Sequence, residues 1–167
     1  NIPFVPAGTY TLVITTDGRA TTVLTGVAAG TATTVVNGTA TAFAPPVSSM
    51  ADVTGTVTAT TVSGSTTTSI AVTDADVRAL QALTGGPTIE VAMRAVDSTN
   101  GTYSMRLPLA APLKGTFVAG TGTAALTPDT AAAGKYTLRA QAPGRTAVER
   151  SVTLGTSTTS GDLTFLP

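Results

Sequence analysis

Oxygen-bearing side chains gather at two places in the sequence and could bind a hard cation such as calcium, which prefers several oxygen ligands. Asp74 and Asp76 lie two residues apart, and residues 97–100 read Asp-Ser-Thr-Asn. Asp and Asn also stabilise turns by accepting hydrogen bonds from the backbone that follows them. The turn interpretation explains both places without an ion, so we expect no metal ligand at either.

Side chains suited to catalysis are scarce. The sequence contains no Cys, His or Trp, which removes the thiolate nucleophile, the commonest general base and the commonest metal ligands. Ser and Lys are present, but the G-x-S-x-G turn that exposes a nucleophilic serine does not occur. We therefore expect no catalytic residue, no cofactor and no enzymatic activity.

Three tyrosines occupy equivalent positions. Tyr10, Tyr103 and Tyr136 each stand two residues after a glycine. Their rings could form a platform on which a sugar stacks. The repeated position instead favours a structural role, in which the ring lies in the core and the hydroxyl makes a hydrogen bond.

The charge content argues against a nucleic-acid partner. Charged residues make up 11% of the 167 residues, and the nine basic residues balance the nine acidic ones, whereas a typical soluble domain has about 25% charged residues. Binding to nucleic acid needs basic side chains clustered on one face, usually with aromatic rings for stacking. Here the basic residues are scattered singly, and 4% of the residues are aromatic.

The composition also indicates a location. No run approaches the ~20 apolar residues that cross a bilayer, and the chain does not open with a basic segment followed by an apolar one. We expect a mature or processed product without a membrane span. A Thr-rich chain with few charges and no Cys suits a secreted, extracellular protein of the bacterial cell surface, held together by its core alone.

The clearest internal pattern is a repeat. Residues 7–12 read Ala-Gly-Thr-Tyr-Thr-Leu and precede Asp-Gly-Arg at 17–19, while residues 133–138 read Ala-Gly-Lys-Tyr-Thr-Leu and precede Pro-Gly-Arg at 143–145. In each copy a strand with Tyr and Leu on one face follows a turn glycine, and a second glycine turn leads into another alternating strand. Each copy is therefore a predicted β-hairpin.

The predicted fold class is all-β, because Thr and Val dominate the sequence and favour strands. Consecutive prolines at 45–46 remove backbone donors and mark a domain boundary. Residues 1–44 are then about three C-terminal strands of an incomplete β-sandwich, and residues 45–52 are a Pro-rich linker. Residues 53–167 are a complete sandwich of about seven or eight strands.

Short alternating segments provide the strands of the second domain. They are residues 53–59, 70–83, 88–96, 102–109, 148–154 and 163–165 together with a strand at Tyr136, and residues 63–66 are a polar loop. Residues 76–83 contain good helix formers and could instead form a helix. The strand is favoured because Val77 and Ala79 alternate with bulkier neighbours.

Several short motifs, taken in order, match one known family. They are Val53-x-Gly55-x-Val57, Asn100-Gly101-x-Tyr103, Ala133-Gly134-x-Tyr136-x-Leu138, Pro143-Gly144-Arg145 and Asp162-Leu163-x-Phe165. The pattern resembles the carboxypeptidase regulatory-like, or prealbumin-like, β-sandwich over about residues 53–167, and its last three strands over about residues 4–43. It also looks like the C-terminal half of secreted bacterial lipoproteins whose N-terminal domain has no assigned function. The resemblance implies an immunoglobulin-like sandwich outside the cell and no catalysis.

Two departures from related modules matter. An insertion near residues 110–130 interrupts the second domain, and such an insertion is where a module could acquire its own binding surface. Related pilin-type modules close an isopeptide bond between a Lys of the first strand and an Asn of the last. This chain has neither residue in those strands, so we expect no such crosslink.

An incomplete first domain poses a physical problem, because three strands cannot cover their apolar face or satisfy their edges. Three explanations stay open: the sequence is a fragment of a longer protein, the missing strands were not included, or another subunit donates them. Donation repeated head to tail would build a filament. The apolar positions expected at this assembly interface are Tyr10, Leu12, Ile14, Val23, Val35 and Val36.

The expected function is that of a non-catalytic structural or adhesive protein of the bacterial surface, which self-associates into an extracellular filament by strand complementation. The alternative is an accessory module of a larger secreted protein that binds a carbohydrate or a protein, with the insertion at residues 110–130 as the binding surface. A purely structural subunit should bind only itself, so a ligand screen would distinguish the two.

Overall fold

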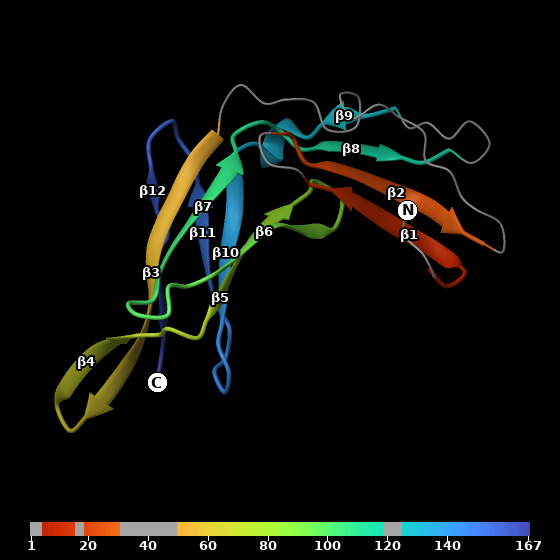
Figure 1. The fold of residues 1–167 in the computed structure, drawn as a ribbon. Helices are drawn as coiled ribbons and strands as arrows, with labels where there is room; N and C mark the ends of the chain where they lie inside the picture. Colours follow the sequence, from red (N-terminus) through yellow and green to blue (C-terminus); the bar gives the residue numbers. More distant parts are fainter. Residues whose placement is uncertain (1–4, 16–18, 31–49, 119–124) are drawn as a thin grey trace.

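The computed structural model describes residues 5–15, 19–30, 50–118 and 125–167, and these residues form an all-β protein (Figure 1). The all-β class predicted from the β-branched composition is confirmed. Helical structure in the described residues is limited to the 3₁₀ turn Thr130–Ala132. Within these ranges no helix has the length and apolar character needed to cross a membrane.

One layer of a sandwich is built around the long strand β3 (Met50–Ser63). Its first half pairs antiparallel with β7 (Thr102–Pro108), and its second half pairs antiparallel with β4 (Thr66–Ala71). The short strands β12 (Thr159–Ser160) and β13 (Leu163–Phe165) pair with β3 in parallel. The C-terminal residues thus complete the sheet that β3 begins.

The second layer has the strand order β11-β10-β5-β6 and is antiparallel throughout. Its strands are β5 (Asp76–Ala82), β6 (Thr88–Ala95), β10 (Lys135–Gln141) and β11 (Val148–Thr153). Buried and partly exposed residues alternate along β5. The strand predicted there in preference to a helix is therefore confirmed.

The main core lies between these two sheets. Val53 and Val57 on β3 and Leu107 on β7 are fully buried from one side, and Val77 on β5 and Leu138 on β10 are fully buried from the other. Aliphatic side chains at alternate strand positions therefore meet face to face, as expected of a sandwich. Burial of such side chains contributes about 1.5–3 kcal/mol each.

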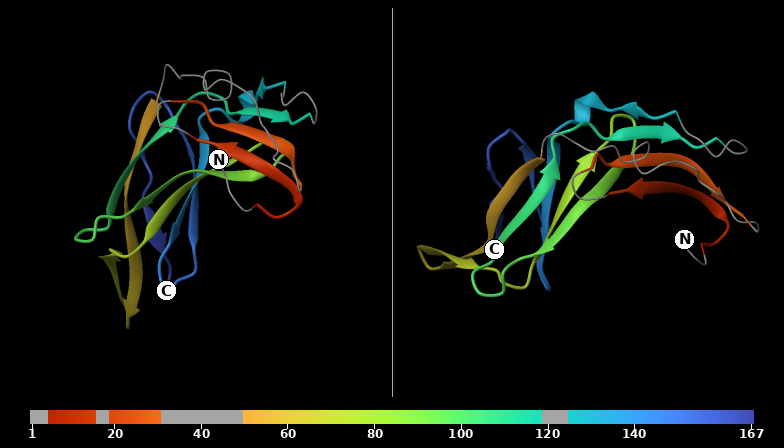
Figure 2. Two further views of the ribbon diagram at one scale, coloured as in Figure 1. Left: turned by 45° about the vertical axis from the view of Figure 1, so that its right-hand side comes forward. Right: turned by 45° about the horizontal axis from the view of Figure 1, so that its top comes forward.

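A third sheet has the strand order β1-β2-β8-β9. β1 (Gly8–Ile14) and β2 (Thr22–Ala29) form an antiparallel hairpin, β8 (Leu113–Thr116) pairs with β2 in parallel, and β9 (Thr127–Pro128) pairs with β8. Figure 2 shows this sheet beside the sandwich, next to the ends of β5 and β6. Residues 110–130, predicted as an insertion, thus supply two strands to the sheet that the N-terminal hairpin begins.

Both predicted repeat units are hairpins. β1 pairs with β2 and β10 pairs with β11, each in antiparallel register. Gly144 in the second hairpin turn has a φ of +69°, which glycine adopts without steric cost. Residues 31–49, which include the predicted third strand and most of the predicted linker, lie outside the described residues.

One predicted strand boundary was wrong, and one predicted loop is a turn. The single strand expected at residues 70–83 is divided into β4 and β5, because the chain bends at Thr73 and Asp74, just after Val72, whose N–H still donates to the carbonyl oxygen of Val57 on β3 at 2.8 Å. The polar loop expected at residues 63–66 is a tight turn whose flanking residues belong to β3 and β4. Gly64 makes this turn possible with a φ of +60°.

Candidate functional site

The residues predicted for an assembly interface lie on the N-terminal hairpin. Tyr10, Leu12 and Ile14 alternate along β1, and Val23 lies on β2. Val35 and Val36 lie outside the described residues. The hairpin thus brings four of the six predicted residues together.

These four residues differ in burial. Val23 is 1% exposed and packs with Leu83 and Ile89 at the end of the sandwich. Leu12 and Ile14 are half-buried, whereas Tyr10 is 38% exposed. The inner strand of the hairpin is therefore covered by its own chain, and the outer strand is not fully covered.

Leu24 is a buried residue of this hairpin that the sequence pattern did not identify. It directly follows Val23, and both are buried although neighbours in a strand point to opposite faces. The register of β1 and β2 shifts between Tyr10 and Leu12, where Thr25 and Gly26 oppose one β1 residue. Gly26 has a φ of +74°, so a glycine inside an alternating strand was the available signal for this bulge.

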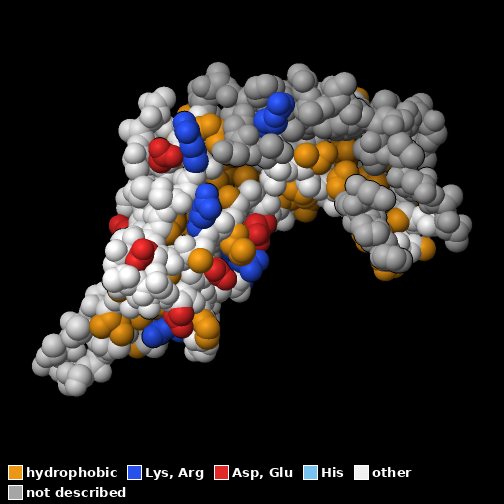
Figure 3. Space-filling model, in the orientation of Figure 1, with side chains coloured by type: hydrophobic (Ala, Val, Ile, Leu, Met, Phe, Trp, Pro, Cys, Tyr) orange, Lys and Arg blue, Asp and Glu red, His pale blue; other side chains and the backbone are white. Residues whose placement is uncertain are grey.

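The outer edge of β1 is open within the described structure, since β1 pairs there with β2 alone. No charged side chain occurs in β1, and Tyr10 and Val13 are 38% and 36% exposed. Figure 3 shows the Lys, Arg, Asp and Glu side chains mainly over the sandwich, with hydrophobic side chains at the surface toward β1 and β2. An edge with unpaired backbone groups and no charge is a template for another strand.

β8 fixes the inner strand of the hairpin to the rest of the molecule. The N–H of Leu113 donates to the carbonyl oxygen of Thr21, and the N–H of Phe117 donates to that of Thr25, both at 2.8 Å. Phe117 is 8% exposed. The insertion is therefore hydrogen-bonded along β2 and leaves β1 as the outer strand.

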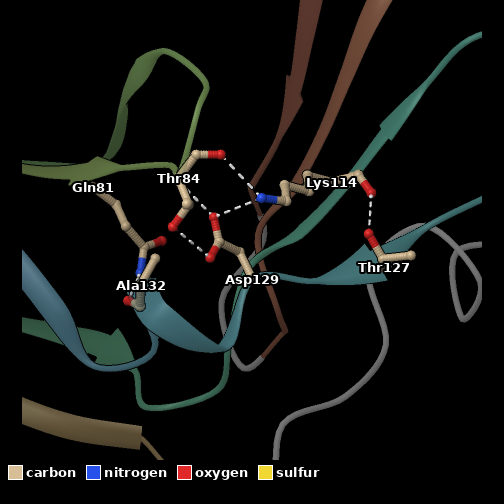
Figure 4. A network of polar contacts seen from close by, with 6 residues as sticks. All are labelled: Gln81, Thr84, Lys114, Thr127, Asp129 and Ala132. Carbon is tan, nitrogen blue, oxygen red and sulfur yellow. Dashed lines mark hydrogen bonds and ion pairs between the residues drawn. The ribbon is translucent and has the colours of Figure 1, made fainter.

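A polar junction formed by Thr84, Lys114 and Asp129 joins the third sheet to the sandwich (Figure 4). The Asp129 carboxylate is buried and accepts hydrogen bonds from the N–H of Thr84 at 2.7 Å and from its hydroxyl at 3.0 Å. Lys114 Nζ lies 3.2 Å from the same carboxylate and donates to the carbonyl oxygen of Thr84 at 3.0 Å. Beside the junction, Gln81 donates to the carbonyl oxygen of Ala132 at 2.8 Å.

The electrostatics of the junction favour a charged carboxylate. The hydrogen bond from the Thr84 N–H is the main cause that lowers the pKa of Asp129, with smaller contributions from the Thr84 hydroxyl and Lys114, while burial opposes them. These contacts favour the ionised carboxylate, which holds the insertion through its ion pair with Lys114.

Two of the three tyrosines have the predicted structural role. Tyr103 is 6% exposed and donates to the carbonyl oxygen of Gly161 at 2.5 Å, and Tyr136 is 3% exposed and donates to that of Pro108 at 2.7 Å. Burial, and secondarily Asp162, raises the pKa of Tyr103 to about 12. Burial also raises the pKa of Tyr136. Both rings are therefore core residues.

Tyr10 departs from this pattern, because its ring is exposed. Its hydroxyl donates to the carbonyl oxygen of Pro6 at 2.8 Å, four residues away. The local motif determines the position of the ring on its strand, whereas burial of the ring depends on a second sheet packed against that strand. In the described part of the chain the Tyr10 ring stays 38% exposed.

The oxygen-rich segment 97–100 forms a turn, as the turn interpretation predicted. Asp97 accepts the N–H groups of Thr99 at 2.8 Å and Asn100 at 3.3 Å, and Asn100 accepts the N–H of Thr102 at 2.9 Å. Among the described residues no group of three His, Cys, Asp or Glu side chains is placed to hold a metal ion. Asp76 is the first residue of β5, and Asp74 lies two residues before it.

Comparison with known proteins gives no matching family model, no matching curated protein and no matching solved structure. The likeness to carboxypeptidase regulatory-like domains therefore stays a proposal that depends on the short motifs alone.

Proposed function

We propose that this chain is a non-catalytic structural protein of the bacterial surface that associates with other copies of itself into an extracellular filament. The observation that carries this proposal is the open edge of β1. This strand of seven residues pairs on one side with β2, carries no charge and has exposed Tyr10 and Val13. Addition of a strand from another copy would satisfy its backbone groups and cover these side chains.

The charge distribution supports self-association. Asp17 and Arg19 are the only charged residues among the first 51, and the net charge of the whole chain is +0. Copies with no net charge do not repel one another over long distances, and a protein near zero charge associates more readily. β1 itself thus lacks the charges with which many proteins protect an edge strand.

The surface location rests on composition. A chain rich in Thr, with 11% charged residues and no Cys, keeps its solubility through hydroxyl groups and needs no disulfide. The covered hairpin strand β2 and the junction at Asp129 support a role in which the third sheet is held rigidly for contact with a neighbour. A rigid edge loses little entropy when a partner binds.

Sedimentation velocity over a range of protein concentrations, with electron microscopy of the concentrated sample, tests this proposal. We expect species larger than the monomer to grow with concentration and to appear as linear particles. The double variant Thr9→Lys with Thr11→Lys places two charges on exposed β1 positions and should weaken association by about tenfold or more. The matched control Ser151→Lys adds a charge to an exposed position of β11 and should associate like wild type. A monomer at every concentration would overturn the proposal.

A ligand-binding accessory module is the second candidate, and one cavity favours it. A hollow of about 420 Å³ lies between β2, the turn after β5 and the insertion, with Val23, Thr84, Lys114 and Thr116 in its lining. This volume falls within the range of small-molecule sites. A glycan array and a protein-capture screen test this candidate, and saturable binding that is lost in Thr116→Trp would favour it over the structural role.

A further inference from the structure

The second half of β3 and β4 form a hairpin that projects from the sandwich, here named the arm (residues 60–71). Pairing of β3 with β13 ends at Ala59, and beyond it β3 pairs within the described structure with β4 alone. Residues 61–71 are all exposed. Figure 1 shows the arm extending beyond the other strands, away from β1 and β2. A two-stranded ribbon is marginally stable in water unless another element packs against it.

The side chains of the arm suit pairing with another strand. No charged residue and no proline occurs between Asp52 and Asp74. Val62 and Ile70 are 59% and 46% exposed, and the remaining positions are mostly Thr and Ser. Segments with many β-branched residues and no charge or proline readily add to an open sheet edge.

The other edges among the described strands are protected. β7, which pairs with β3 alone, carries Arg106 and ends at Pro108. β6 carries Glu90 and Arg94, and β11 carries Glu149 and Arg150. β9 has two residues, one of them proline. Charges, proline and short length all discourage strand addition. Among the described edge strands of four or more residues, β1 and β4 therefore stand apart as uncharged.

We infer that β4 of one copy pairs with β1 of the next copy, an inference that rests on the self-association proposed above. β4 has six residues and β1 has seven, so each spans roughly 20 Å and the two can pair along their full length. The pairing would cover Ile70 together with one face of β1, which carries either Tyr10 or Val13 because these two residues point to opposite faces of the strand, and no charge would be buried. Within the described ranges β1 pairs with β2 alone and β4 pairs with β3 alone, so one edge of each strand is open to such a contact.

The geometry of this contact makes it head to tail. Because the arm and β1 occupy different ends of the molecule (Figure 1), each copy that donates its arm still has a free β1 edge. A contact between two different surfaces builds an open chain when the rotation between copies does not close a ring. A contact confined to one strand pair is small beside the ~800 Å² per partner of a standard interface, so the chain should grow only at high protein concentration.

Cysteine cross-linking tests which strands meet, and the absence of native Cys makes every thiol assignable. Thr11→Cys on β1 and Thr68→Cys on β4 replace exposed residues. One variant is isotopically labelled, the two are mixed at a concentration where wild type assembles, and a short thiol-reactive cross-linker is added. We expect the mixed Thr11→Cys and Thr68→Cys dimer to exceed either self-linked dimer at least about tenfold, as mass spectrometry of the linked peptides would measure. Ser151→Cys on β11 is the matched control and should form no such dimer with either variant.

The outcomes separate this inference from the proposed function. An excess of self-linked Thr68→Cys dimers would mean that two arms pair with each other. Assembly without any cross-link through the arm would mean that another surface pairs with the β1 edge. Either result overturns the inference and leaves self-association intact. Absence of assembly in wild type overturns both. Hydrogen exchange of wild type gives a second readout that needs no variant: the amides of β1 and β4 should both slow as concentration rises, while those of β6 should not.

Discussion

Lys114 Nζ lies 3.2 Å from a carboxylate oxygen of Asp129 at the junction where the insertion meets the sandwich. Asp129 is 4% exposed, and its carboxylate also accepts two hydrogen bonds from Thr84. The pair connects β8, and through β8 the N-terminal hairpin, to the turn that follows β5. The buried carboxylate therefore holds the third sheet against the sandwich together with the packing of Val23 on Leu83 and Ile89.

Replacement of Asp129 should loosen this connection. Asp129→Ala leaves the N–H of Thr84 without its acceptor and leaves Lys114 Nζ with the carbonyl oxygen of Thr84 alone, and hydrogen bonds to a charged group contribute about 1.5–3 kcal/mol. We expect a loss of about 2–3 kcal/mol in the free energy of unfolding, measured with urea. Relative to wild type, amide hydrogen exchange in the variant should accelerate more in β2 and β8 than in β10, because the third sheet opens locally.

The exposed ion pair between Arg106 and Asp52 provides the control. Its atoms lie 4.0 Å apart, and the two side chains are 66% and 55% exposed. An exposed pair of this kind contributes little, so Asp52→Ala should leave the unfolding free energy within ~0.5 kcal/mol of wild type. Equal losses in Asp129→Ala and Asp52→Ala would contradict the role assigned to the junction.

The stability that Asp129 contributes should depend on pH in the acid range. The Thr84 N–H is the main cause that lowers the folded-state pKa of Asp129 below its ordinary value of 3.8, so the ionised form is favoured by folding. The difference in stability between wild type and Asp129→Asn should be fully present above the ordinary value and should vanish as the pH falls through the lowered one. Urea unfolding of both proteins from about pH 7 to about pH 2 measures this difference. A difference that stays constant to the lowest pH would exclude the carboxylate as its source.

Sequence patterns predicted the elements whose packing is local. The alternation around Val77 and the repeated Gly-x-Tyr motif were sufficient to predict strands and hairpins, because side-chain period and turn glycines act over a few residues. The parallel pairing of β2 with β8 joins residues about 90 positions apart in the chain, and no local pattern encodes such a contact. For the same reason the junction at Asp129 was not predicted. Its three residues come from separate segments, and in the sequence each of them resembles an ordinary turn or loop residue.

The three tyrosines should separate into two classes when their hydroxyls are removed. Tyr103→Phe and Tyr136→Phe leave the buried carbonyl oxygens of Gly161 and Pro108 without a donor, and each should reduce the free energy of unfolding by about 1 kcal/mol. Tyr10→Phe removes a hydroxyl from an exposed ring and should change stability by less than ~0.5 kcal/mol. Chemical denaturation of the three variants measures this. A loss for Tyr10→Phe as large as the other two would mean that the Tyr10 ring is covered in solution. If that loss grew with protein concentration, the cover would come from assembly.

The close approach of the C-terminal segment to β3 should make Gly161 intolerant of any side chain. A Cβ at this position would overlap the Tyr103 hydroxyl and would lie 2.7 Å from Leu138 Cδ1 and 2.8 Å from Val53 Cγ1. These neighbours are buried core atoms that cannot all move away, so Gly161→Ala should cost about 3 kcal/mol or more by overpacking. Gly155→Ala is the matched control, because no atom lies within 4 Å of its added Cβ, and it should be neutral or slightly stabilising. Thermal unfolding of both variants tests the claim, and a Gly161→Ala protein as stable as Gly155→Ala would show that the C-terminal strands do not pack on β3 as described.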